Sequence, residues 1–137
     1  MSYALTDAQV MSTLREIVSE SPDKVYEAPE SMADEYGGCF YVHNNDDGTK
    51  SAGCIVGQVL HRLGVSLEDL SKGETYSANA AVALAGVQGV SEDVVYFLRM
   101  VQSRQDRGTP WGEALQFAEE YYADKGSAAV LRPEAVA

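Results

Sequence analysis

The sequence predicts a mainly α-helical single domain with about five short helices and one small β-hairpin. Helix caps stand repeatedly before apolar residues at helical spacing, whereas only the stretch near 39–52 places strand-forming residues around a turn. The chain has 137 residues, 45% of them hydrophobic and 23% charged, which is ordinary for one globular domain. We therefore expect one compact domain over residues 1–125. Residues 126–137 have no cap or periodicity, which predicts a flexible tail.

The first helix begins at a capping box. Thr6 and Gln9 stand three residues apart, so the Thr6 hydroxyl and the Gln9 amide can each accept a hydrogen bond from an end N–H group. Ser21-Pro22-Asp23 ends the helix, and the prolines and glycines of residues 22–38 predict a loop with a short extended piece at 24–26. The apolar face of this helix consists of Val10, Leu14, Ile17 and Val18.

The predicted hairpin runs from Cys39 to Ala52. Cys39–His43 is rich in strand-forming residues, Asn44–Gly48 reads as a turn, and Thr49–Ala52 reads as the return strand. A helix follows from about residue 51 or 53 to Leu63, since Gly64 suits a left-handed C-terminal position. The Gly53-x-x-x-Gly57 spacing predicts that this helix packs closely on the hairpin.

The second half of the chain predicts further helices. Ser66 begins a single turn that Gly73 ends, and an alanine-rich helix covers Ser77–Leu84. Ser91, with two acids after it, caps a longer helix that ends at Gly108. A last helix restarts directly at Thr109-Pro110, with threonine as N-cap and proline at the first helical position, and runs to about Asp124.

The charge of the chain disfavours several classes of protein. Its net charge is −11, and only ten Lys and Arg residues are available to contact phosphates, so direct nucleic-acid binding is not expected. No apolar stretch is long enough to span a bilayer, and the first residues have no signal-peptide pattern, so we expect no membrane association. Two cysteines do not make a secreted disulfide scaffold, which favours a cytoplasmic location.

Four residues could form a zinc site, namely Cys39, His43, Cys54 and His61. Cys39 and His43 share a strand face but stand roughly 13 Å apart, and Cys54 and His61 stand roughly 10 Å apart on one helix side. These spacings make one tetrahedral four-ligand site awkward, so we expect no cofactor. A mixed site that uses Cys39 with Cys54, or Cys54 with His43, stays open, as does a zinc-stabilised structural domain.

Cys54 and His43 are also the candidates for catalysis. Cys54 follows Gly53 near a helix N-terminus, where the helix dipole lowers the pKa of a thiol, and His43 could act as its base. The neighbours Ile55 and Val56 instead indicate a core cysteine, and no third orienting residue is evident. The loop at 43–54 fails as a calcium loop because His43 and Cys54 fall where acids are needed.

Three aromatic residues are candidates for partner binding. Trp111 could anchor an interface, although a lone Trp in the first turn of an amphipathic helix is more often a core residue. Tyr121 and Tyr122, near the end of the last helix, could form an exposed contact surface.

The motifs C-x-Y-V-H at 39–43, G-C-I-V-G-Q-x-L-H-R-L-G at 53–64 and V-Q-x-x-Q-D-x-G-x-x-W-G-x-A at 101–114 occur in this order. This pattern resembles small uncharacterised proteins of actinobacteria and their phages, over much of residues 10–120. The resemblance implies a cytoplasmic protein of a bacterium or a phage-infected bacterium. It implies no activity, cofactor or catalytic residue.

These observations favour a non-enzymatic, acidic binding module. One form of this hypothesis is a phage accessory protein that binds a host protein. The negative charge, the small size and the absence of a convincing active site lead to this hypothesis. One alternative is a cysteine-dependent hydrolase or transferase that uses Cys54 and His43. The other is the zinc-stabilised domain. The sequence predicts neither the partner protein nor the oligomeric state.

Overall fold

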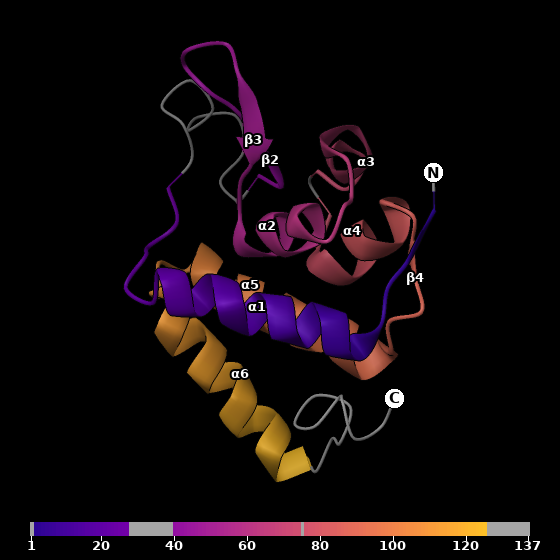
Figure 1. Cartoon of the computed structure of the whole chain (residues 1–137). Coiled ribbons are helices and arrows are strands. Elements are labelled where there is room, and N and C mark those ends of the chain that lie inside the picture. The colour runs from indigo at the N-terminus through magenta and orange to yellow at the C-terminus, as the bar shows by residue number, and fades with distance from the viewer. Residues whose placement is uncertain (1, 28–39, 75, 126–137) are drawn as a thin grey trace.

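Helices dominate the computed structural model of the chain, which describes residues 2–27, 40–74 and 76–125 (Figure 1). The mainly α prediction with a small β part is confirmed, with six helices in the described residues rather than about five. The additional helix is the short segment that the sequence predicted as a single turn after Ser66. The helices are α1 (Asp7–Glu20), α2 (Ile55–Arg62), α3 (Leu67–Ser71), α4 (Ala78–Leu84), α5 (Glu92–Asp106) and α6 (Trp111–Lys125).

Side-chain caps define the starts of α1, α3 and α5. The Thr6 hydroxyl accepts from the Gln9 N–H at 3.1 Å, and the Gln9 side chain accepts from the Thr6 N–H at 2.9 Å, so the capping box is present. The Ser66 and Ser91 hydroxyls cap α3 and α5 by accepting from the Asp69 and Val94 N–H groups. Ser77 precedes α4 without capping it, because its hydroxyl hydrogen-bonds to the Asn79 side chain instead.

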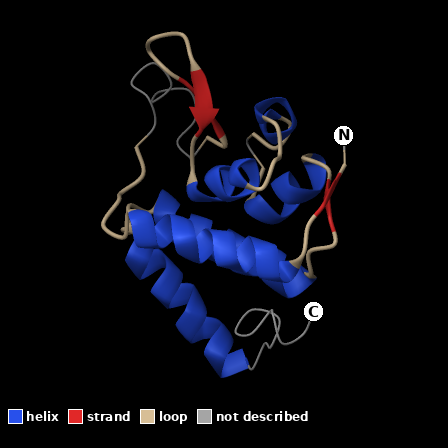
Figure 2. Cartoon of the chain, viewed as in Figure 1, coloured by secondary structure: helices blue, strands red, loops and turns tan. Residues whose placement is uncertain are grey.

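Two small sheets accompany the helices (Figure 2). The predicted hairpin is present as β2 (Val42–Asn44) paired antiparallel with β3 (Lys50–Ala52), so its first strand begins later than Cys39, which lies outside the described residues. A parallel pair of two-residue strands, β1 (Tyr3–Ala4) and β4 (Val87–Gln88), was not predicted, because two residues carry no periodicity. No described strand includes residues 24–26, where the sequence predicted an extended piece.

The hairpin is held to the helices by close contacts at its base. A methyl group on Gly57 would collide with the Tyr41 carbonyl oxygen, and one on Gly53 would collide with the Phe40 carbonyl oxygen and the His43 ring. The predicted close packing of α2 on the hairpin is thereby confirmed. The Glu74 carboxylate accepts the Tyr41 and Val42 N–H groups at 2.7 and 3.1 Å, and burial raises the pKa of this carboxyl.

The core lies where α1, α2, α4, α5 and α6 meet. Every apolar residue that the sequence placed on the inner face of the first helix is buried, and Val94, Leu98 and Val101 of α5 are buried as well. No helix in the described part of the chain combines the length and the apolar character that a membrane span requires. Residues 126–137, the predicted tail, lie outside the described residues.

Helices α5 and α6 form an antiparallel pair joined by a short turn. The pairing of Phe97 with Tyr122 at one end and of Arg104 with Phe117 at the other sets their antiparallel direction. Loop carbonyls satisfy the start of α6, since Trp111 N–H donates to Lys24 O at 2.9 Å. The inner faces of both helices join the core, and their outer faces form the surface described next.

Candidate functional site

Cys54 lies in the core at the start of α2. Its side chain is 0% exposed and makes no capping hydrogen bond. The N–H groups of Ile55 and Val56 donate to the side-chain oxygens of Gln105 and Gln102 at 2.8 and 3.3 Å. The donors that a catalytic cysteine would use to stabilise an oxyanion are therefore occupied by two buried glutamines of α5.

We expect the Cys54 thiol of the folded chain to resist alkylation, because a buried thiol is inaccessible to reagent. Treatment with N-ethylmaleimide followed by peptide mass spectrometry measures this. The peptide with Cys54 is expected to stay unmodified in buffer and to become fully modified in concentrated urea. Rapid labelling of Cys54 in buffer would contradict its core position and would support the cysteine-dependent alternative.

His43 lies half-buried on β2 beside Gly53. Its Nε2 atom is 2.7 Å from the Tyr26 hydroxyl, which itself accepts the Phe40 N–H at 2.9 Å. The Tyr26 hydroxyl therefore links the His43 ring to the backbone at Phe40. Burial, and secondarily the positive charge of Lys24, lowers the pKa of His43.

The lowered pKa of His43 predicts a pH-dependent stability. Because the unfolded chain binds the proton more readily, stability is fully present above the ordinary pKa of 6.5 and declines as the pH falls through the folded pKa. Urea unfolding between about pH 7 and pH 5 should show this decline. The variant His43→Gln should show a smaller decline than His61→Gln, and equal declines in the two variants would contradict the assignment.

The four proposed zinc ligands do not appear as a set in the described structure. His61 is exposed, and its Nδ1 atom is 2.9 Å from the Val65 carbonyl oxygen. Cys39 lies outside the described residues. Among residues 2–27, 40–74 and 76–125, no three His, Cys, Asp or Glu side chains are close enough together to hold a metal ion.

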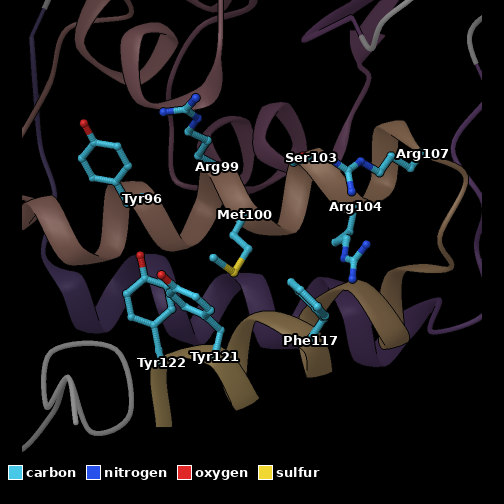
Figure 3. Close-up of a pocket in the computed structure, with 9 residues that line it drawn as sticks. All are labelled: Tyr96, Arg99, Met100, Ser103, Arg104, Arg107, Phe117, Tyr121 and Tyr122. Carbon is cyan, nitrogen blue, oxygen red and sulfur yellow. The ribbon is translucent and has the colours of Figure 1, made fainter. Parts of the chain in front are cut away.

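A groove of about 500 Å³ lies between the outer faces of α5 and α6 and is here called the α5–α6 groove (Figure 3). Both helices contribute side chains to it, because each buries one face and leaves the other to solvent. Its lining residues are Tyr96, Arg99, Met100, Ser103, Arg104, Arg107, Phe117, Tyr121 and Tyr122.

Arginines give this groove a positive character on a negative molecule. Arg99, Arg104 and Arg107 are three of the ten Lys and Arg residues of the whole chain. Within the described residues no carboxylate lies within 4.0 Å of these guanidinium groups, and the ion pairs involve other cations. The Arg104 guanidinium carbon lies 3.6 Å from the centre of the Phe117 ring, a cation–π stack.

Aromatic side chains form the other end of the groove, where Figure 3 places Tyr96, Tyr121 and Tyr122 together. Tyr96 and Tyr121 are 39% and 43% exposed, whereas Tyr122 is buried beneath them with its ring 5.4 Å from Phe97. Burial, followed by the negative charge of Asp93, raises the pKa of Tyr122. This end therefore combines an apolar floor with two aromatic rings open to solvent.

The three aromatic residues that the sequence offered as candidates for partner binding lie in two different places in the structure. Tyr121 and Tyr122 line the groove, whereas Trp111 is 1% exposed and lies in the core under the Lys24 ammonium group. The sequence did not predict the groove. The spacing of Tyr96, Met100, Ser103, Arg104 and Arg107 along one outer helix face was the signal for it.

Comparisons with known proteins add no assignment. No protein-family model, curated protein sequence or solved structure matches the chain. The resemblance to small actinobacterial and phage proteins therefore stays a prediction. Any function assigned to the chain rests on the charges and contacts of its own residues.

Proposed function

We propose that the chain is a non-enzymatic binding module that docks a protein partner in the α5–α6 groove, and that this partner presents an acidic segment. One observation carries the proposal. Arg99, Arg104 and Arg107 line the groove with no carboxylate of the described chain within 4.0 Å, although the whole chain has 21 acidic residues. Carboxylates from a partner would complement these cations.

The composition of the groove suits a protein partner. Tyrosine, phenylalanine, methionine and arginine are the residue types enriched at the centres of protein interfaces. Of the six large hydrophobic side chains that are exposed in the described residues, Tyr96, Phe117 and Tyr121 lie in this groove. Three exposed hydrophobic side chains in one groove favour a contact surface over chance exposure.

The charge of the whole chain disfavours a nucleic acid as the occupant. Arginine and aromatic side chains also bind single-stranded nucleic acids, by phosphate contact and base stacking. Here the net charge of −11 would repel a phosphate backbone that extends beyond the groove. A short acidic segment of a protein meets the three arginines without placing a long negative polymer along the surface.

The setting is also part of the proposal. The resemblance to actinobacterial and phage proteins suggests a phage accessory protein that acts on a host protein in the host cytoplasm. The groove is compatible with this role because docking alone can block or recruit a partner, with no active site required. Neither the catalytic alternative at Cys54 and His43 nor the zinc alternative is favoured by a specific observation in the described residues.

Site-specific photo-crosslinking tests the docking. Benzoyl-phenylalanine in place of Phe117 puts a photoreactive group in the groove, and the same group in place of Tyr76 serves as the control. Tyr76 is also an exposed aromatic residue but does not line the groove. After irradiation in a lysate of the natural host, mass spectrometry identifies the cross-linked peptide.

The proposal expects one dominant adduct from the position of Phe117, within a partner segment rich in Asp and Glu. The adduct should be lost when Arg104→Ala and Arg107→Ala are added, and the position of Tyr76 should not form it. Adducts with no acidic bias, or an adduct that persists without both arginines, would overturn the proposal. A captured protein alone, without the acidic segment, would not support it.

A further inference from the structure

We infer that the α5–α6 groove binds a peptide segment with two distinct parts. Acidic side chains of the segment contact the Arg104 and Arg107 end of the groove, and an aromatic or long aliphatic side chain of the segment contacts the Tyr96 and Tyr121 end. The inference rests on the proposed function, because it specifies the partner that the groove would dock. Figure 3 separates the two ends, with Met100 between the tyrosines and the Arg104–Phe117 stack.

Arg104 is oriented before any partner arrives. Its guanidinium group lies 3.6 Å over the centre of the Phe117 ring, and the ring occupies one face of that planar group. The N–H donors lie in the plane of the guanidinium, so the stack leaves them available for two parallel hydrogen bonds to a carboxylate. Phe117 is in this sense a positioning residue, and Arg104 is the contact residue.

A second cation stands beside Arg104. Arg107, the C-cap residue of α5, follows Arg104 by three positions, and both side chains line the groove. Asp106 does not line the groove, and its carboxylate accepts a hydrogen bond from the Gln105 side chain at 2.9 Å. The arginine end thus presents two positive charges and suits a pair of acidic residues.

The tyrosine end has a different character. Arg99 is its cation, with the guanidinium carbon 5.9 Å from the centre of the Tyr96 ring. The exposed rings and the Met100 side chain form the surface that a partner side chain would contact at this end.

The length of the groove sets the spacing of the two parts. Tyr96 and Arg104 are eight residues apart in α5, which corresponds to about 12 Å along the helix. An extended peptide rises about 3.3 Å per residue, so the acidic residue and the apolar residue of the segment stand about four positions apart. The segment can run in either direction along the groove, with its acidic residues before or after the apolar residue.

Short synthetic peptides test this directly by fluorescence anisotropy. The probes are labelled Asp-Asp-Gly-Gly-Gly-Phe and its reverse, each with two matched forms in which Asn replaces Asp or Ser replaces Phe. One orientation is expected to bind, and each matched form of it is expected to bind about tenfold more weakly. A thymidine oligonucleotide of similar length is measured beside them.

Substitutions in the chain test which end of the groove contacts each part of the peptide. Arg104→Ala should remove the preference for Asp over Asn while the preference for Phe over Ser stays, and Tyr121→Ala should do the reverse. Arg104→Lys keeps the charge but lacks the planar fork, so it should recover only part of the Asp preference. Lys50→Ala and Tyr76→Ala, which change a cation and an aromatic residue outside the groove, should leave all affinities unchanged.

The possible outcomes separate the two proposals. Binding that depends on Asp and Arg104 but not on Phe or Tyr121 would overturn the two-part segment and leave acidic docking intact. Binding that no groove variant weakens would overturn the location of docking itself. Absence of binding by every peptide up to about 1 mM, or tighter binding of the oligonucleotide than of any peptide, would overturn both proposals.

Discussion

Replacing Trp111 with alanine is expected to lower the free energy of unfolding by about 3–5 kcal/mol. Trp111 is 1% exposed and heads the largest fully buried side chains, so its removal leaves a cavity between α6 and the loop at residues 22–24. Its Nε1 atom has no hydrogen-bond partner in the described residues, so the loss comes from packing and not from a broken hydrogen bond. Urea unfolding followed by far-UV circular dichroism measures it, because the variant has no other tryptophan to report fluorescence.

The matched control is Tyr121→Ala, which changes an aromatic residue on the exposed face of the same helix. We expect it to lower the unfolding free energy by only about 1 kcal/mol, because the Tyr121 ring is 43% exposed and packs edge-on against Tyr122. Comparing the two variants distinguishes an aromatic residue of the core from an aromatic residue of the contact surface. If Trp111→Ala were as stable as the parent chain while Tyr121→Ala unfolded, the division of aromatic roles would be wrong.

Replacing Gln105 with leucine is expected to cost about 1–3 kcal/mol, although leucine is similar in size and more apolar. The Gln105 oxygen accepts the Ile55 N–H at 2.8 Å, and Gln105 is 1% exposed, so no water is at hand to replace it. An orphaned N–H at the buried start of α2 is the physical cause of the loss. Denaturant unfolding measures it, and faster hydrogen exchange of the Ile55 amide should accompany it.

Gln116→Leu provides the comparison for Gln105. Gln116 is an exposed glutamine of α6 whose side-chain amide donates a hydrogen bond to Glu120 at 3.1 Å. Its replacement should leave stability within about 0.5 kcal/mol of the parent chain. Equal stability of the two leucine variants would mean that the Gln105 oxygen is not needed at the start of α2.

Local signals in the sequence predicted much of the fold. The Thr6 capping box, the Ser91 cap and the apolar stripe of the first helix depend on residues a few positions apart, so they can be read without knowing the tertiary structure. The close approach of Gly57 to the hairpin was also predictable, because a glycine on a helix lets a neighbouring backbone come close to the helix surface.

Long-range contacts explain what the sequence did not predict. Gln105 lies 50 residues from the N–H group it caps, and Glu74 lies 33 residues from Tyr41. The same holds for the α5–α6 groove, which exists only because two helices join their outer faces side by side. Tyr121 and Tyr122 were candidates from the sequence, but Arg99, Arg104 and Arg107 were not, because their lack of an ion pair with a carboxylate of the described residues depends on the fold.

The most direct test of the central claim is a two-dimensional amide NMR spectrum of the isotope-labelled chain, titrated with Asp-Asp-Gly-Gly-Gly-Phe and its reverse. We predict that the shifted resonances cluster at the groove side of α5 and α6, around Met100, Arg104, Phe117 and Tyr121, and that they stop shifting in R104A/R107A. Shifts that instead gather on the hairpin or on α4, or that persist in R104A/R107A, would contradict the account.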